Sequence, residues 1–256
     1  MSKRHKFLIT SLVLSLGFFG ITFLENEDRL VGIAALSLGS IIMFFWTLRE
    51  GIKRDATLLC LILPPLFTLG VGLFWFLLPS TFYARLPIIV LYGIGVYSIA
   101  LTANVLTVSV LKKIALARAA KGVSFVLTLF TLFLLYDAVL SLKASIFIAS
   151  SAVLVASFPL FLQGLWVSRI TKEVGSEILI YSGVFSYVVG GVAVLMYFWP
   201  VSVVVGYLFL TVVVYILLGL GQAKIEARLF RQTVNEYLTI GTIVFLIMLL
   251  STNWHG

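Results

Sequence analysis

Asp137 is the only carboxylate in the apolar run that extends from about residue 123 to 142. An ionisable side chain is costly to bury in such a run, and this cost makes it a candidate for function. Three roles are open for Asp137. The first is that of an interfacial carboxylate, solvated or paired near Lys143. The second is the uptake of a proton or a cation. The third is a structural ion pair with Arg85.

Three further polar residues accompany Asp137 in apolar runs. The Asn104 amide either bonds a neighbouring helix or contacts a substrate. Tyr97 and Tyr136 either line a cavity or anchor helix ends at the membrane interface. Together with Asp137 these residues form a candidate intramembrane polar site. Gln163, close to the end of its run, is expected to contact lipid headgroups.

The residues that usually hold metals are sparse in this chain. Cys60 is the only cysteine, so neither an internal disulfide nor a thiolate cage can form. The two histidines, His5 and His255, lie at opposite ends of the sequence. We therefore expect no metal, no cofactor and no catalytic residues, and we rank an enzyme behind the two function classes given below.

The composition is that of an integral membrane protein. Of the 256 residues 61% are hydrophobic and 11% are charged, and the mean hydropathy is +1.16. Soluble domains carry about 25% charged residues, so this chain cannot cover its apolar surface in water. The formal charge of +8 is spread over short clusters between apolar runs. This distribution suits anionic lipid headgroups and gives no reason to expect nucleic acid binding.

Nine apolar runs are long enough to cross or nearly cross a bilayer. They predict an all-α transmembrane bundle that forms a single integral membrane domain over residues 1–256. The predicted spans are 7–24, 30–48, 56–78, 86–111, 123–142, 144–168, 177–199, 201–221 and 237–251. Pro64 and Pro65 lie inside the third predicted span and should bend or break it, and Pro159 should kink the sixth.

The basic residues orient these spans. With the N-terminus in the cytoplasm, inner segments hold fifteen Lys and Arg residues and outer segments hold three. Because basic residues accumulate on the cytoplasmic side, we expect a multi-pass protein of the inner membrane with its N-terminus inside and its C-terminus outside.

Two basic segments are candidates for contacts with anionic headgroups or with a protein partner. Residues 222–236 are too polar to span and are predicted to form an amphipathic helix on the cytoplasmic surface. The other segment is the loop before the fifth span. The basic residues are Lys112, Lys113, Arg118, Lys121, Lys224, Arg228 and Arg231.

The same two segments show a faint internal repeat. Lys113-Ile114 followed by Ala117-Arg118 precedes the fifth span, and Lys224-Ile225 followed by Ala227-Arg228 precedes the ninth. Each copy comes after a span that starts behind an outer proline turn. Two such units would point the same way across the bilayer, as parallel repeats do in some transporters.

Five segments carry a resemblance to known sequences: FWFLLPSTFYARLP (74–87), LYGIGVYSIALTANV (91–105), RAAKGVSFVLTLFTLFLLYDAVLS (118–141), FPLFLQGLW (158–166) and FWPV (198–201). As a set they resemble an uncharacterised family of polytopic membrane proteins from candidate-phyla bacteria with small genomes. The resemblance implies a bacterial inner-membrane location and brings no activity with it.

Two function classes remain as hypotheses. The first is a small transporter, or a protein that handles lipid or lipid-linked substrates, with Asp137 and Asn104 at its cavity. The second is a non-catalytic membrane subunit that docks a protein partner through its basic cytoplasmic segments, or that forms a homo-oligomer.

Overall fold

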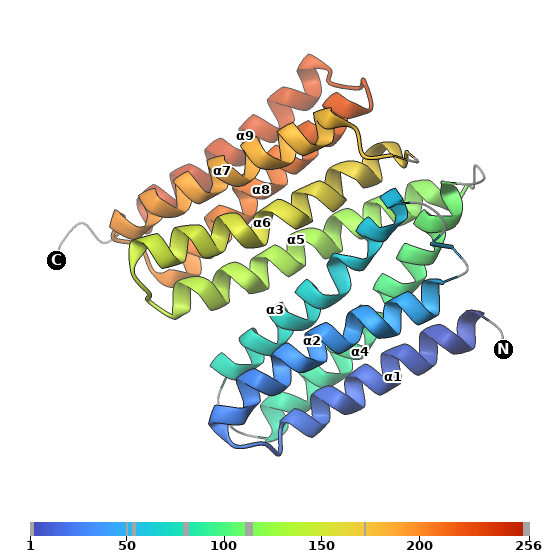
Figure 1. The fold of residues 1–256 in the computed structure, drawn as a ribbon. Helices are drawn as coiled ribbons and strands as arrows, with labels where there is room; N and C mark the ends of the chain where they lie inside the picture. Colours follow the sequence, from blue (N-terminus) through green and yellow to red (C-terminus); the bar gives the residue numbers. More distant parts are fainter. Residues whose placement is uncertain are drawn as a thin grey trace. The chain divides into compact units, whose positions relative to one another are not determined.

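The computed structural model describes residues 3–49, 51–52, 55–78, 82–110, 115–171 and 173–252, and these are mostly helical (Figure 1). Within them nine helical segments are long and apolar enough to cross a membrane, and the described residues contain no strand. The predicted all-α bundle of nine spans is therefore confirmed. The elements are α1 Lys3–Ile21, α2 Asn26–Leu48, the 3-10 helix η1 Asp55–Leu61, α3 Leu63–Leu77, α4 Phe82–Ser109, α5 Ala117–Ser141, α6 Ile146–Arg169, α7 Ser176–Phe198, α8 Val203–Ile225 and α9 Arg231–Leu250.

The contacts within the chain separate the helices into two compact units. Unit 1 contains Met1–Leu134 and Ile170–Glu173, and unit 2 contains Leu135–Arg169 and Val174–Gly256. Most of α5 belongs to unit 1, and its last turns belong to unit 2. Each unit therefore has packed helices of its own.

Unit 1 is built around an aromatic centre. α1 packs on α2 and α4, and α3 also packs on α2 and α4. The Phe18 and Tyr92 ring centroids are 4.9 Å apart, and Phe67 stacks on Tyr92 at 5.9 Å. Ser11 Oγ donates a 2.6 Å hydrogen bond to the Gly93 carbonyl, which requires the close approach of α1 and α4 that a glycine permits.

The third span is broken where the two prolines lie. η1 precedes α3, and Pro64 and Pro65 occupy the first turn of α3. Because neither proline has an N–H group, neither can donate to a carbonyl one turn earlier, and an α-helix cannot continue unchanged through this point. The predicted break at Pro64 and Pro65 is confirmed. Pro159 lies inside α6, which continues through it.

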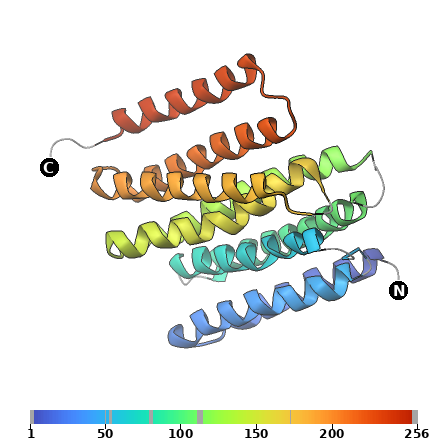
Figure 2. The ribbon, with the colours of Figure 1, turned by 45° about the horizontal axis from the view of Figure 1, so that its top comes forward.

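Unit 2 packs α6 on α7 and α8, α7 on α8, and α8 on α9. Gly164 of α6 faces Leu218 of α8 closely enough that a Cβ there would lie 2.8 Å from the leucine side chain. Gln222 Nε2 donates a 2.9 Å hydrogen bond to the Gly164 carbonyl across the same contact. α9 lies at the edge of this unit (Figure 2), and Met248 is its one buried residue.

The order of packing is repeated along the chain. α2 packs on α3 and α4, which pack on each other, and α6 packs in the same way on α7 and α8. Trp46-x-x-Arg49 lies at the end of α2, and Trp166-x-x-Arg169 lies at the end of α6. The repeated packing covers α2–α4 and α6–α8.

The structure differs from the predicted amphipathic helix over residues 222–236. α8 continues to Ile225, which is buried, and a short turn separates it from α9 at Arg231. The turn is a Schellman motif: Ala227 has a φ of 56°, and the Arg228 N–H donates to the Ala223 carbonyl. Packing of Ile225 extends α8, and the left-handed Ala227 then stops it. The last membrane helix consequently begins at Arg231, six residues earlier than the predicted start of the ninth span.

Candidate functional site

Asp137 lies in the last turns of α5 and belongs to unit 2. Its exposed fraction is 8%, so little of the side chain can reach solvent. Ser141, one turn later on the same face, donates a hydrogen bond from Oγ to Asp137 Oδ1 at 3.3 Å.

No Lys or Arg among the described residues forms an ion pair with Asp137. Lys143 is exposed in the turn that follows α5, and the Arg85 side chain lies outside the described residues. Buried carboxylates normally pair with a cation or collect several hydrogen bonds. Asp137 has one long hydrogen bond instead, which leaves most of its acceptor capacity unused.

Tyr136 and Asp137 are neighbours in sequence but differ in role. The Tyr136 side chain is fully buried, and its hydroxyl forms a 2.7 Å hydrogen bond with Ser157 Oγ of α6. Tyr136 therefore ties the end of α5 to α6. Its hydroxyl is already used in this contact, which favours a structural role over one in lining a cavity.

Asn104 and Tyr97 lie on α4, which belongs to unit 1, and both are half-buried. The Asn104 carbonyl accepts a 3.0 Å hydrogen bond from Thr107 Oγ1. Because Asp137 and Tyr136 belong to unit 2, neither unit assembles all four residues of the predicted polar site. Within unit 2, the structure places Ser141 in contact with Asp137.

Gln163 is deeply buried, and the predicted headgroup contact is wrong. Its exposed fraction is 2%, and its Oε1 has no hydrogen-bond partner among the described residues. The carbonyl of the next residue, Gly164, accepts from Gln222. The burial of the Gln163 amide depends on which helices surround the end of α6, and the sequence alone does not give that arrangement.

The basic residues remain at the surface where the structure describes them. Arg118 is exposed at the start of α5 and Lys121 is half-buried, while Lys112 and Lys113 lie outside the described residues. Lys224, Arg228 and Arg231 are exposed around the connection between α8 and α9. Arg228 approaches Glu226 at 3.7 Å, and a pair this exposed contributes little stability.

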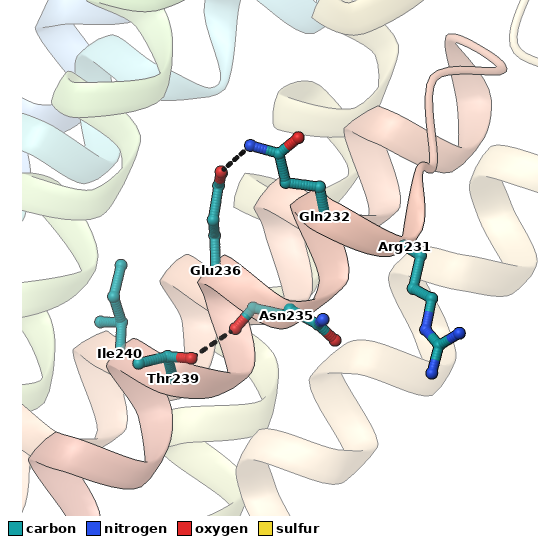
Figure 3. Close-up of a pocket in the computed structure, with 6 residues that line it drawn as sticks. All are labelled: Arg231, Gln232, Asn235, Glu236, Thr239 and Ile240. Atoms are coloured by element: carbon teal, nitrogen blue, oxygen red, sulfur yellow. Dashed lines mark hydrogen bonds between the residues drawn. The ribbon is translucent and has the colours of Figure 1, made fainter.

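α9 carries a polar face that is not among the sites predicted from the sequence. Gln232, Asn235, Glu236 and Thr239 are all exposed and follow the spacing i, i+3, i+4, i+7 of one helix face. With Arg231 and Ile240 they line a hollow on the helix surface, and Figure 3 shows Gln232 and Glu236 joined by a hydrogen bond. The spacing of these residues could have indicated a polar face on a membrane helix, but residues 222–236 were predicted to form a surface helix instead.

A family model described as "Protein of unknown function (DUF5656)" matches residues 9–251. The chain belongs to this family. No curated protein and no solved structure matches it. The predicted membership of an uncharacterised family is confirmed.

The DUF5656 match extends from α1 to the end of α9 and includes both units. Asp137 and the polar face of α9 therefore lie inside the region that defines the family. The family description assigns no activity, so a functional proposal must come from the chemistry of these residues.

Proposed function

We propose that this chain is a small transporter of the bacterial inner membrane, with its N-terminus in the cytoplasm, in which Asp137 takes up the coupling proton or cation. The observation that supports this proposal is a carboxylate at 8% exposure whose one hydrogen-bond partner among the described residues is Ser141. A small solute, a lipid or a lipid-linked molecule would be the substrate.

The physical argument concerns the charge of Asp137. An ionised carboxylate buried without a cation costs on the order of several kcal/mol, whereas a neutral or cation-bound carboxyl group costs far less. Such a carboxyl group binds or releases its proton or cation when its surroundings open to water on one side of the membrane. Coupled transport requires a group of this kind, which is why intramembrane carboxylates often mark ion pathways.

Two features of the fold agree with transport. The third span is divided into η1 and α3, and discontinuous spans form binding sites in several transporter folds. The helix packing of α2–α4 is repeated in α6–α8, and internal repeats are also common among transporters.

Everted membrane vesicles that contain the protein would test the proposal. Respiration establishes a pH gradient, a fluorescent amine dye reports it, and a panel of Na⁺, K⁺, Ca²⁺ and charged organic solutes is added in turn. We expect at least one solute to dissipate the gradient, Asp137→Asn to abolish the response, and Asp137→Glu to restore part of it. Glu27→Gln, which changes an exposed carboxylate of α2, is the matched control.

Lipid substrates need a parallel assay, in which fluorescent lipids are followed across proteoliposomes with the same variants. The proposal fails if Asp137→Asn behaves like the unchanged protein, or if neither assay distinguishes the protein from empty vesicles.

A second candidate function is a non-catalytic subunit that docks a cytoplasmic partner. The observation in its favour is the turn between α8 and α9, where Phe230 is 66% exposed beside the exposed Arg228 and Arg231. Reversing both arginines to Glu should then release a polypeptide that otherwise copurifies with the protein from its own membrane.

A further inference from the structure

The Ser141 hydroxyl is used differently from most serine and threonine hydroxyls in the helices of unit 2. Ser150, Ser182 and Thr211 each donate to the carbonyl of the residue four positions earlier, which is a common arrangement in membrane helices. Ser141 instead donates to the side chain of Asp137, four positions earlier on the same face of α5. Two side-chain oxygens of α5 therefore lie together near its end.

The distance between these two oxygens is long for a hydrogen bond to a carboxyl group. Asp137 Oδ1 and Ser141 Oγ are 3.3 Å apart, whereas a hydroxyl normally lies about 2.5–2.7 Å from an ionised carboxylate oxygen. A protonated carboxyl group would bond a hydroxyl at about 2.7–2.8 Å. The two oxygens are therefore neighbours without a strong bond to each other, as two ligands of one ion are.

The separation of the two oxygens fits a cation of a particular size. Where metal–oxygen distances are about 2.3–2.6 Å, as for Ca²⁺, ligands at a right angle lie roughly 3.3–3.7 Å apart. The shorter Mg²⁺ distances, about 2.0–2.1 Å, would bring such ligands to roughly 2.8–3.0 Å. Na⁺ is nearly as large as Ca²⁺, and K⁺ is larger than both. Asp137 and Ser141 therefore suit an ion of the size of Na⁺ or Ca²⁺.

The charge of the Asp137 side chain distinguishes these two ions. Asp137 supplies one negative charge, which neutralises a monovalent cation but leaves a divalent cation with excess charge in apolar surroundings. The described residues contain no group of three or more His, Cys, Asp and Glu side chains that could hold a metal ion. With 8% exposure, the Asp137 carboxylate is therefore matched in charge by one Na⁺.

The end of α5 also favours a cation. α5 ends at Ser141, and the last carbonyl groups of a helix carry a partial negative charge that attracts cations. The Lys143 N–H donates to the Leu140 carbonyl at 3.2 Å, and the Val139 carbonyl accepts no backbone hydrogen bond among the described residues. An ionised Asp137 adds negative charge to this helix end, so a bound cation relieves the repulsion.

We propose that Asp137 and Ser141 form a Na⁺ site, in which the carboxylate Oδ1 and the hydroxyl Oγ are ligands and carbonyl or water oxygens complete the coordination. This inference rests on the proposed transport function and deepens it, because it names Na⁺ as the cation that Asp137 takes up.

Thermal unfolding of the purified full-length protein in lipid nanodiscs would test the site. Tm is measured in choline chloride, and again after choline is replaced by Na⁺ or K⁺ at the same ionic strength. We expect Na⁺ at about 100 times its Kd to raise Tm by roughly 5 °C, and K⁺ to have little effect. Binding of radioactive ²²Na⁺ to the same protein gives a second readout, with one ion per chain expected.

Three variants separate the two ligands. Asp137→Asn should abolish both Na⁺ responses. Ser141→Ala should raise the Na⁺ concentration at half of the Tm shift by roughly tenfold, and Ser141→Thr, which keeps a hydroxyl, should restore most of the affinity. Ser150→Ala is the matched control, because Ser150 is also half-buried and its hydroxyl bonds the Ile146 carbonyl of its own helix.

The Na⁺ site is overturned if Tm is the same in Na⁺ and choline, if K⁺ raises Tm as much as Na⁺, or if Asp137→Asn keeps the Na⁺ response. An equal loss of affinity in Ser141→Ala and Ser150→Ala would also overturn it. Failure of the site differs from failure of transport. If Asp137→Asn abolishes the vesicle response but the protein binds no Na⁺, transport stands and the site is wrong. If Na⁺ binds but neither vesicle assay responds, the site stands and transport is wrong.

Discussion

Ser141 Oγ donates to Asp137 Oδ1 at 3.3 Å, and this is the one hydrogen bond that the carboxylate makes within the described chain. Both residues lie on α5, one turn apart, so the contact does not tie α5 to another helix. A carboxylate placed in this way adds little to stability, and its presence in a span needs another explanation than packing.

Asp137→Asn should therefore stabilise the protein while removing its proposed activity. The amide keeps the shape of the side chain and no longer requires burial of a charge, so we expect a gain of about 1 kcal/mol, or roughly 2–4 °C in Tm. Thermal unfolding in detergent measures this change. A fall in Tm would mean that the ionised carboxylate is held by contacts stronger than the Ser141 hydrogen bond.

Tyr136→Phe should have the opposite effect. It removes the 2.7 Å hydrogen bond to Ser157 from a fully buried pair, and we expect a loss of about 1 kcal/mol. Ser157 keeps its bond to the Val153 carbonyl, so it is not left without a partner. A double-mutant cycle with Ser157→Ala isolates the interaction energy between the Tyr136 and Ser157 side chains. A value near zero would contradict a stabilising contact between α5 and α6 at this pair.

Gly72→Ala should destabilise unit 1. A Cβ at this position would lie 2.5 Å from Ile33 Cγ2, at the contact between α2 and α3, and overpacking of this kind costs about 1–3 kcal/mol. Gly183→Ala is the control, because nothing lies within 4 Å of the added carbon. The control should be neutral or slightly stabilising, since alanine favours a helix. Equal melting temperatures for the two variants would contradict the close approach at Gly72.

Ala227→Gly should stabilise the end of α8. Ala227 has a φ of 56°, in the left-handed region where a Cβ costs roughly 1–2 kcal/mol per residue. Glycine fits this position of a Schellman motif without that cost, so we expect a higher Tm. Ala119→Gly, at an exposed helical position of α5, should lower the Tm by comparison. The same direction of change in both variants would argue against the left-handed turn.

Reporter fusions would test the orientation that the basic residues predict. A fluorescent protein joined to the N-terminus should fold in the cytoplasm, and a phosphatase joined to the C-terminus should be active outside it. The physical reason is the excess of Lys and Arg in alternate segments. An inactive C-terminal phosphatase would contradict the predicted orientation with nine spans.

The sequence by itself determined the number of spans and the place where one of them breaks. Both depend on local properties: the length of an apolar run, and the missing N–H groups of Pro64 and Pro65. Asp137 was also recognisable from the sequence, because a single carboxylate in an apolar run needs no neighbours to be noticed.

Tertiary structure decided which way each polar side chain faces. Lipid is as apolar as a protein interior, so hydrophobicity in a membrane span does not distinguish a residue that packs from one that faces the bilayer. This is why Gln163 was expected at the headgroups and lies buried, and why Gln232, Asn235 and Glu236 of α9 were assigned to a surface helix. Only the packing of Tyr237 and Met248 on one side of α9 leaves Asn235 and Thr239 facing outward on the other.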